Sequence, residues 1–127
     1  DDSPPLIRYK ISCRAAENLI LSDEVLHNLG TNWAELMVSI DRWLDNFNDH
    51  SKHGIMANFK NGGFDRKGFN LKELRNVIVG LTPSSKPWEI AVGQVVGKIG
   101  ANEIPKDFSE NKICNYLGNK LADKIRA

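Results

Sequence analysis

The chain lacks the features that would assign its function directly. No segment approaches the roughly 18–20 consecutive apolar residues that a membrane-spanning helix needs, so we expect a soluble protein with no membrane contact. The only two cysteines are Cys13 and Cys114, and small secreted domains usually carry more disulfides than one bridge. We therefore expect two free, buried thiols, which favours an intracellular protein.

Motifs for nucleotide and covalent chemistry are also missing. Neither G-x-x-x-x-G-K-[ST] nor G-x-G-x-x-G is present, which argues against a phosphate-binding loop and a nucleotide cofactor. There is no G-x-S-x-G or H-E-x-x-H, so neither a hydrolase elbow nor a zinc-protease helix is predicted. Cys114 falls on the apolar side of a predicted helix, which favours a structural thiol over a nucleophile. No cofactor is expected.

What the chain does contain is enough apolar sequence for one core. Its 127 residues are 41% apolar and 26% charged, which is typical of a globular domain, and we expect a single domain over 1–127. Apolar spacings of three and four predict a mainly α fold of about six helices around that core. The predicted helices cover about 13–21, 23–29, 32–47, 70–81, 85–100 and 107–125.

Two helix boundaries carry clear chemical markers. Gly30 should end the second predicted helix, and Asn32 with Glu35 three positions later matches a capping box at the start of the third. The segment before the first helix is ambiguous. Residues 7–13 alternate apolar and polar as a short N-terminal strand does, yet the Ser-Pro-Pro at 3–5 is also a helix-start pattern.

The Gly-rich segment in the middle of the chain predicts a β-hairpin. It contains Asn61 followed by Gly62 and Gly63, and an Asn-Gly pair suits the positive φ angles of a type I′ turn. We expect a hairpin or ordered loop over about 55–69.

The charge of the chain changes sign near its middle. Segment 22–51 holds six acidic residues and one basic residue, so it sums to −5, while segment 52–75 holds six basic and two acidic residues and sums to +4. The whole chain is only +1. This polarity favours a macromolecular binding role over a compact chemical site.

The basic segment predicts a surface for single-stranded RNA. Aromatic rings can stack on unpaired bases while neighbouring cations contact phosphates. The alternative is that the phenylalanines, together with Phe69, point into the core. The predicted residues are Lys52, Phe59, Lys60, Phe64, Arg66 and Lys67.

The acidic segment predicts a face for a basic protein partner, carried by the third helix. The alternative is an ordinary solvated face that balances an amphipathic helix. The predicted residues are Glu35, Asp41, Asp45 and Asp49.

The junction between the two segments holds a pair of histidines. This pair predicts an alternative function, a small, toxin-like, metal-independent ribonuclease. The general acid and the general base would be His50 and His53, and the cation that holds the phosphate would be Lys52 or Lys60. The same stretch offers Asp49 with both histidines to a divalent metal. The sequence favours an ordinary solvated loop after a helix, where His or Lys also suits the helix dipole, and no metal site is predicted.

Taken together, the sequence predicts a non-catalytic binding domain with a charge-polarised surface. Another protein is the expected partner, with single-stranded RNA as an additional contact. The alternative function is the ribonuclease.

Overall fold

The regular secondary structure is entirely helical in the part of the chain described by a computed structural model, residues 15–84 and 86–124. No strand occurs within these ranges, which confirms the mainly α prediction. None of their helices has the length and apolar content needed to span a bilayer. The elements are the 3-10 helix η1 (Ala16–Leu21) and the α-helices α2 (Asp23–Asn28), α3 (Trp33–Asn46), α4 (His53–Asn61), α5 (Arg75–Gly80), α6 (Trp88–Gly100), α7 (Ile113–Leu117) and α8 (Asn119–Ala122).

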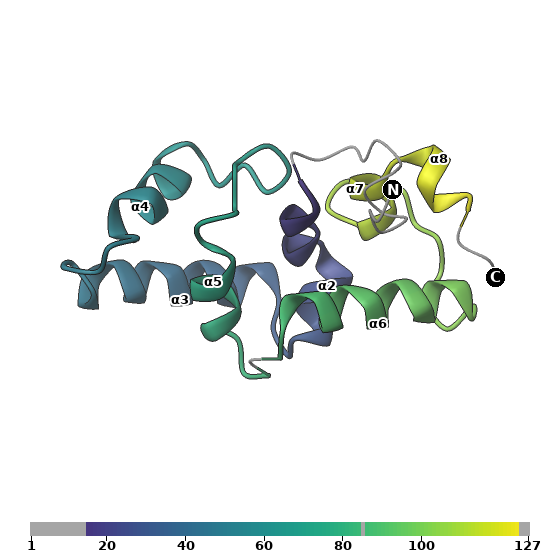
Figure 1. The fold of residues 1–127 in the computed structure, drawn as a ribbon, viewed down its shortest axis with the longest axis horizontal. Coiled ribbons are helices and arrows are strands. Elements are labelled where there is room, and N and C mark those ends of the chain that lie inside the picture. Colours follow the sequence, from purple (N-terminus) through teal and green to yellow (C-terminus); the bar gives the residue numbers. More distant parts are fainter. Residues whose placement is uncertain (1–14, 85, 125–127) are drawn as a thin grey trace, which may run out of the picture.

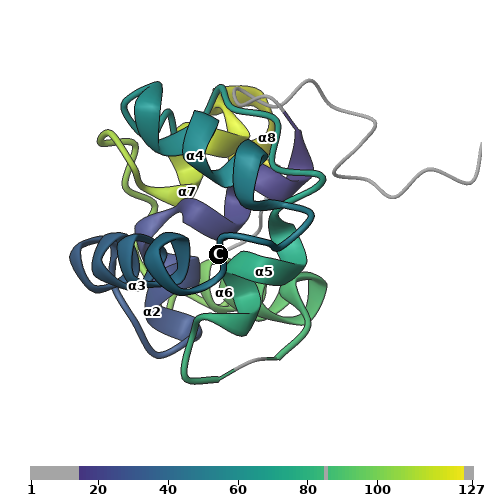
Figure 2. The ribbon, with the colours of Figure 1, turned by 90° about the vertical axis from the view of Figure 1, so that its left-hand side faces the viewer.

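The helices form two levels. The long helices α3 and α6 lie with α2 and α5 in the lower level, and α4, α7 and α8 lie above them (Figures 1 and 2). Helix η1 lies between the levels and contacts α2, α6 and α7. At one end of the molecule α3 extends below α4, and at the other α6 lies below α7 and α8 (Figure 1).

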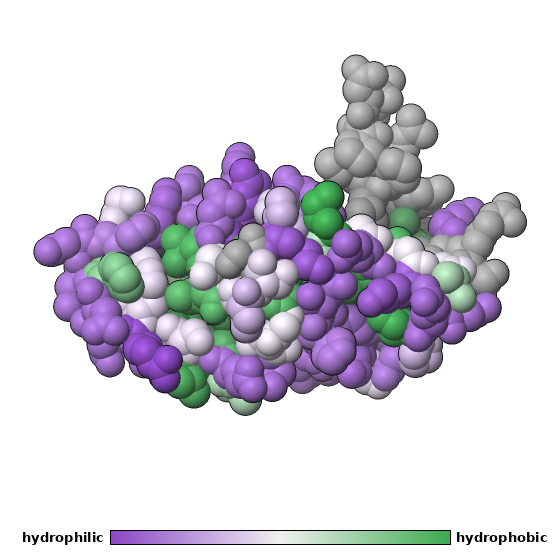
Figure 3. Space-filling view, turned by 90° about the horizontal axis from the view of Figure 1, so that it is seen from below, coloured by the Kyte–Doolittle hydropathy of each residue, from purple (hydrophilic) through white to green (hydrophobic). Residues whose placement is uncertain are grey.

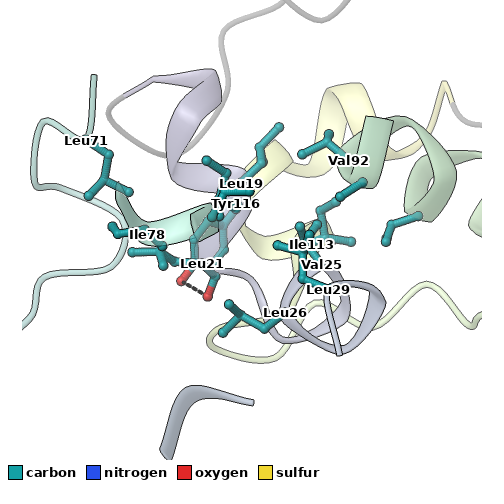
Figure 4. Close-up of a cluster of buried hydrophobic side chains, with 14 of the residues drawn as sticks. Leu19, Leu21, Val25, Leu26, Leu29, Leu71, Ile78, Val92, Ile113 and Tyr116 are labelled. Atoms are coloured by element: carbon teal, nitrogen blue, oxygen red, sulfur yellow. Dashed lines mark hydrogen bonds between the residues drawn. The ribbon is translucent and has the colours of Figure 1, made fainter. Parts of the chain in front are cut away.

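One cluster of buried side chains connects these helices. Every helix contributes to it, and Leu19, Ile20 and Leu21 of η1 are completely buried. Figure 4 shows these η1 leucines beside Tyr116 of α7, whose hydroxyl donates to the backbone oxygen of Leu21 at 3.5 Å. Burying a leucine or isoleucine contributes about 1.5–3 kcal/mol, so this short helix is held by its packing.

Both predicted boundaries around α3 are present. Gly30 has φ 84°, its N–H donates to His27, and the next N–H donates to Leu26, which is the Schellman pattern of a helix C-terminus. The Asn32 side chain accepts from the Glu35 N–H at 2.9 Å and caps α3.

The predicted β-hairpin is wrong, because residues 53–61 form α4. The Asn-Gly-Gly sequence ends this helix: the Gly63 N–H donates to Lys60 and the Phe64 N–H donates to Phe59, each at 3.0 Å. Gly63 has φ 84°, and the rings of Phe64 and Phe59 lie 5.1 Å apart. This is another Schellman motif with its apolar contact, and it uses the same glycine freedom that suggested a hairpin turn.

The last predicted helix is shorter than expected and divided. The Asp107 side chain accepts from the Ser109 N–H at 2.9 Å, and this local turn competes with a helix start. Helix α7 begins at Ile113, and Gly118, with φ 87°, separates it from α8. The predicted N-terminal strand and Cys13 lie outside the described residues, whereas Cys114 is a free, buried thiol.

Candidate protein-interaction surface

The phenylalanines of the predicted RNA surface, Phe59 and Phe64, pack together with Phe69 against the core. Phe59 is fully buried, and Phe64 and Phe69 pack partly buried against the core. Trp33 completes the cluster, with its ring 5.5 Å from Phe64 and edge-on to it. Phe59 and Phe69 lie 5.0 Å apart. Aromatic packing of this kind stabilises the fold and occupies ring surface on which a base would otherwise stack.

The lysines of that predicted surface lie beside acceptors of the chain itself. The Lys52 Nζ lies 2.7 Å from a Glu73 carboxylate oxygen, and the Lys60 Nζ lies 2.6 Å from Asp41. Lys67 donates to the Asn115 side-chain oxygen at 2.5 Å and lies over the Tyr116 ring. Two of the three cations are thus paired with carboxylates.

Arg66 is the most deeply placed of these cations, with only 10% of its side chain exposed. Its guanidinium donates twice to the backbone oxygen of Leu21, at 3.1 and 2.6 Å, and once to Asp23 at 2.7 Å. It also lies 4.6 Å from the Trp33 ring centre, within cation–π range. Arg66 therefore connects the loop after α4 to the end of η1.

The four predicted acidic residues are all exposed, but they are not equivalent. Asp41 forms the ion pair with Lys60 across α3 and α4. Glu35 lies 3.4 Å from the Thr31 hydroxyl. Within the described residues, neither Asp45 nor Asp49 forms an ion pair. A free acidic surface therefore begins near the C-terminal end of α3.

The two histidines pack against Trp43 of α3. Their ring centres lie 5.1 Å (His50) and 6.1 Å (His53) from the indole. His53 Nε2 lies 3.0 Å from the Leu44 carbonyl oxygen, so this nitrogen donates, whereas His50 Nδ1 accepts from the Lys52 N–H at 3.0 Å. One nitrogen of each ring is thus used within the fold. The described residues contain no group of three His, Cys, Asp or Glu arranged to hold a metal ion.

A separate cleft of about 410 Å³ contains titratable side chains of α2, including Asp23 and Glu24. Glu24 accepts the Ile113 N–H at 2.8 Å and so caps α7 from a distant part of the chain. Burial raises the pKa of Glu24 above its usual value, although the hydrogen bond from Ile113 and the charge of Lys112 act in the opposite direction. Burial likewise raises the pKa of the Cys114 thiol, which opposes a role as thiolate nucleophile.

The capping role of Glu24 gives a pH-dependent prediction. A carboxyl whose pKa is raised in the folded state stabilises the fold below its usual pKa, and this contribution is lost as the pH rises. Glu24→Gln keeps an acceptor for Ile113 without the buried charge, so at pH 7 we expect it to be more stable than wild type. Glu24→Ala should lower the free energy of unfolding by about 1–2 kcal/mol, because the Ile113 N–H loses its partner.

Urea unfolding of both variants between pH 3 and pH 7 measures this effect. The advantage of Glu24→Gln should vanish below about pH 4, where the wild-type carboxyl is protonated. A Gln variant less stable than wild type at pH 7, with the difference closing on acidification, would show that the ionised carboxylate is the stabilising form.

An open groove lies beside the end of α3. It has a volume of about 300 Å³ and is lined by Trp43 and Phe47 on one side and by Gly80 and Leu81 on the other. Phe47 is 51% exposed, and its ring is stacked 5.9 Å from that of Trp43. Figure 3 shows the underside of the molecule, where separate apolar patches interrupt a largely hydrophilic surface. Apolar periodicity predicts that Phe47 lies on the packed side of its helix, and it does not predict that the ring is half exposed.

Comparison of the chain with protein-family models, with curated proteins and with solved structures finds no match.

Proposed function

We propose that this chain is a non-catalytic protein-binding domain whose docking surface is the groove at the end of α3. The observation that supports this most strongly is the half-exposed ring of Phe47, stacked on Trp43 at the edge of that groove. An aromatic side chain with a fixed orientation loses little conformational entropy on binding and presents a large apolar area. The carboxylates of Asp45, in the last turn of α3, and Asp49, in the following loop, add an acidic edge to this surface.

The placement of the basic segment favours a protein partner over RNA. An RNA platform needs exposed rings next to cations that are free to meet phosphates. Here Phe59 is buried, and Lys52 and Lys60 are paired with carboxylates. Binding RNA at this segment would require those intramolecular contacts to be exchanged.

The same ion pairs argue against the ribonuclease alternative. A metal-independent ribonuclease needs two proton-transfer groups and a cation around one phosphate. His50 and His53 both lie against Trp43, but Lys52 and Lys60, the proposed clamps, are held by Glu73 and Asp41. The ribonuclease remains a prediction for the experiment to test.

The predicted docking surface can be tested by removing the Phe47 ring. We expect a random peptide library, displayed on phage and panned on the immobilised protein, to yield peptides that bind wild type and lose at least tenfold in affinity for Phe47→Ala. The substitution should change stability by no more than about 1 kcal/mol, because half of the ring is already in water. Binding is measured by fluorescence anisotropy and stability by thermal unfolding.

Val38→Ala is the matched control, since Val38 is 55% exposed on the same helix and does not line the groove. Selected peptides whose affinity is unchanged in Phe47→Ala, or a library that yields no binder, would contradict the proposed surface. A labelled single-stranded RNA incubated with the same protein in chelator tests the alternative. Cleavage that is lost in His50→Ala or His53→Ala would replace the proposed function with a ribonuclease.

A further inference from the structure

An open hollow of about 630 Å³ lies where the end of α2 faces the second half of α6. Its walls come from the last residues of α2, from α6 and from the segments that flank α6, and none of the lining side chains is apolar. The hollow shares no lining residue with the groove at the end of α3, so the two can be tested independently.

The Lys86 ammonium group is fixed at this hollow by two neutral partners. Its Nζ donates to the side-chain oxygens of Asn28 and Gln94, each at 2.9 Å, and all three residues line the hollow. Within the described part of the chain, Lys86 forms no ion pair. The positive charge is therefore held in place without being neutralised, and an anion that enters the hollow meets an oriented cation.

The two amide partners of Lys86 add further hydrogen-bond donors. An ammonium group can only donate, so Asn28 and Gln94 each turn their oxygen toward it and keep their NH₂ group for another acceptor. Neither of these amide nitrogens makes a hydrogen bond within residues 15–84 and 86–124. Together with the remaining N–H of Lys86, they supply donors from both helices that border the hollow.

Lys98 brings a second cation to the hollow. It follows Gln94 by four positions on α6, and side chains at this spacing are neighbours on one face of a helix. Lys98 is exposed, and among the described residues it has no carboxylate partner. The lining thus contains two lysines against one carboxylate, that of Glu103.

We propose that this hollow binds a phosphomonoester carried on a small hydrophilic body, such as a sugar phosphate. A phosphomonoester has about −1.5 to −2 charges at pH 7 and three acceptor oxygens, which suits two cations and two amide donors around one space. The hollow is larger than a phosphate group needs and falls within the roughly 300–1,000 Å³ of small-molecule sites. Since no apolar side chain lines it, the rest of the ligand must be polar. This inference does not depend on the proposed function.

Isothermal titration calorimetry at pH 7 and low ionic strength tests the ligand class with three probes: glucose 6-phosphate, glucose and inorganic phosphate. We expect glucose 6-phosphate to bind at least tenfold more tightly than glucose, and its affinity to fall as salt is added. It should also bind more tightly than inorganic phosphate, because its hydroxyl groups reach the polar walls. No binding of glucose 6-phosphate, or affinities equal to those of glucose, would overturn the inference. Equal binding of inorganic phosphate would overturn the hydrophilic body.

Charge variants test which residues hold the phosphate. Lys86→Met and Lys98→Met should each weaken glucose 6-phosphate at least tenfold, and Glu103→Gln should strengthen it, because it removes the one carboxylate of the lining. Lys98 is exposed, so its substitution tests the site even if Lys86→Met disturbs the contact between α2 and α6. Lys72→Met is the matched control, since it removes the same charge from an exposed position outside the hollow. An equal loss in Lys72→Met would show non-specific attraction and refute the site.

A variant that fills the hollow tests its shape. Gly97 lines the hollow, and a Cβ atom built on it would meet no atom within 4 Å. We therefore expect Gly97→Leu to remain folded, as judged by circular dichroism, and to weaken glucose 6-phosphate at least tenfold. Gly93→Leu is the matched control, because its Cβ would be equally free and Gly93 does not line the hollow. An unchanged affinity in Gly97→Leu, or an equal loss in Gly93→Leu, would place the phosphate elsewhere and refute the inference.

Discussion

Phe59→Ala should lower the free energy of unfolding by about 3–5 kcal/mol, which is the usual effect of truncating a buried phenylalanine. Phe59 is fully buried, and its ring contacts those of Trp33, Phe64 and Phe69. Removal of the ring leaves a cavity at the junction of α3, α4 and the following loop. The free energy of unfolding of a native domain is only about 5–15 kcal/mol, so this substitution removes a large fraction of it.

Chemical denaturation with fluorescence detection of the tryptophans measures this loss. Phe108→Ala is the control, because Phe108 is 39% exposed and should change stability by less than about 1 kcal/mol. A Phe59→Ala protein with wild-type stability and a selective loss of RNA binding would instead place this ring on a nucleic-acid surface.

Arg66→Met should destabilise the protein by about 2–4 kcal/mol, although it retains most of the apolar side-chain length. It removes both hydrogen bonds to the Leu21 oxygen, the ion pair with Asp23 and the contact with the Trp33 ring. The Leu21 oxygen would then keep the long 3.5 Å contact from the Tyr116 hydroxyl. Losing the partner of a buried polar group costs more than losing a solvated contact.

Lys72→Met is the matched control for Arg66, since it removes a cation from the same basic segment at an exposed position. We expect it to change the free energy of unfolding by less than about 0.5 kcal/mol. If both variants unfold at the wild-type urea concentration, Arg66 has no structural role. A loss of RNA binding in Arg66→Met that Lys72→Met does not share would in that case support the predicted RNA surface.

The error at the Gly-rich segment shows the limit of local patterns. Asn-Gly-Gly provides a residue with positive φ, and both a hairpin turn and a Schellman helix end need one. The choice was made by contacts outside the motif, where Phe59 and Phe64 pack with Trp33. Tertiary burial of α4 outweighed the turn preference.

The candidate site was less predictable than the fold. Charge counts placed a basic segment at 52–75, but they could not show that Lys60 would lie beside Asp41 or Arg66 beside Asp23. The groove could not be predicted from the sequence for a similar reason, because it depends on how α3 and α5 approach one another. Apolar periodicity placed Phe47 on the packed side of its helix, whereas half of its ring is exposed.

The sequence alone determined the helical character, the cap of α3 at Asn32 and the glycine, Gly30, that follows α2 and stops it. These depend on apolar periodicity and on capping groups within a few residues of each other. The tertiary structure decided which charges are neutralised, which rings are buried and where a groove is left open. Those properties arise from contacts between residues far apart in the chain, and no local pattern encodes the distances between them.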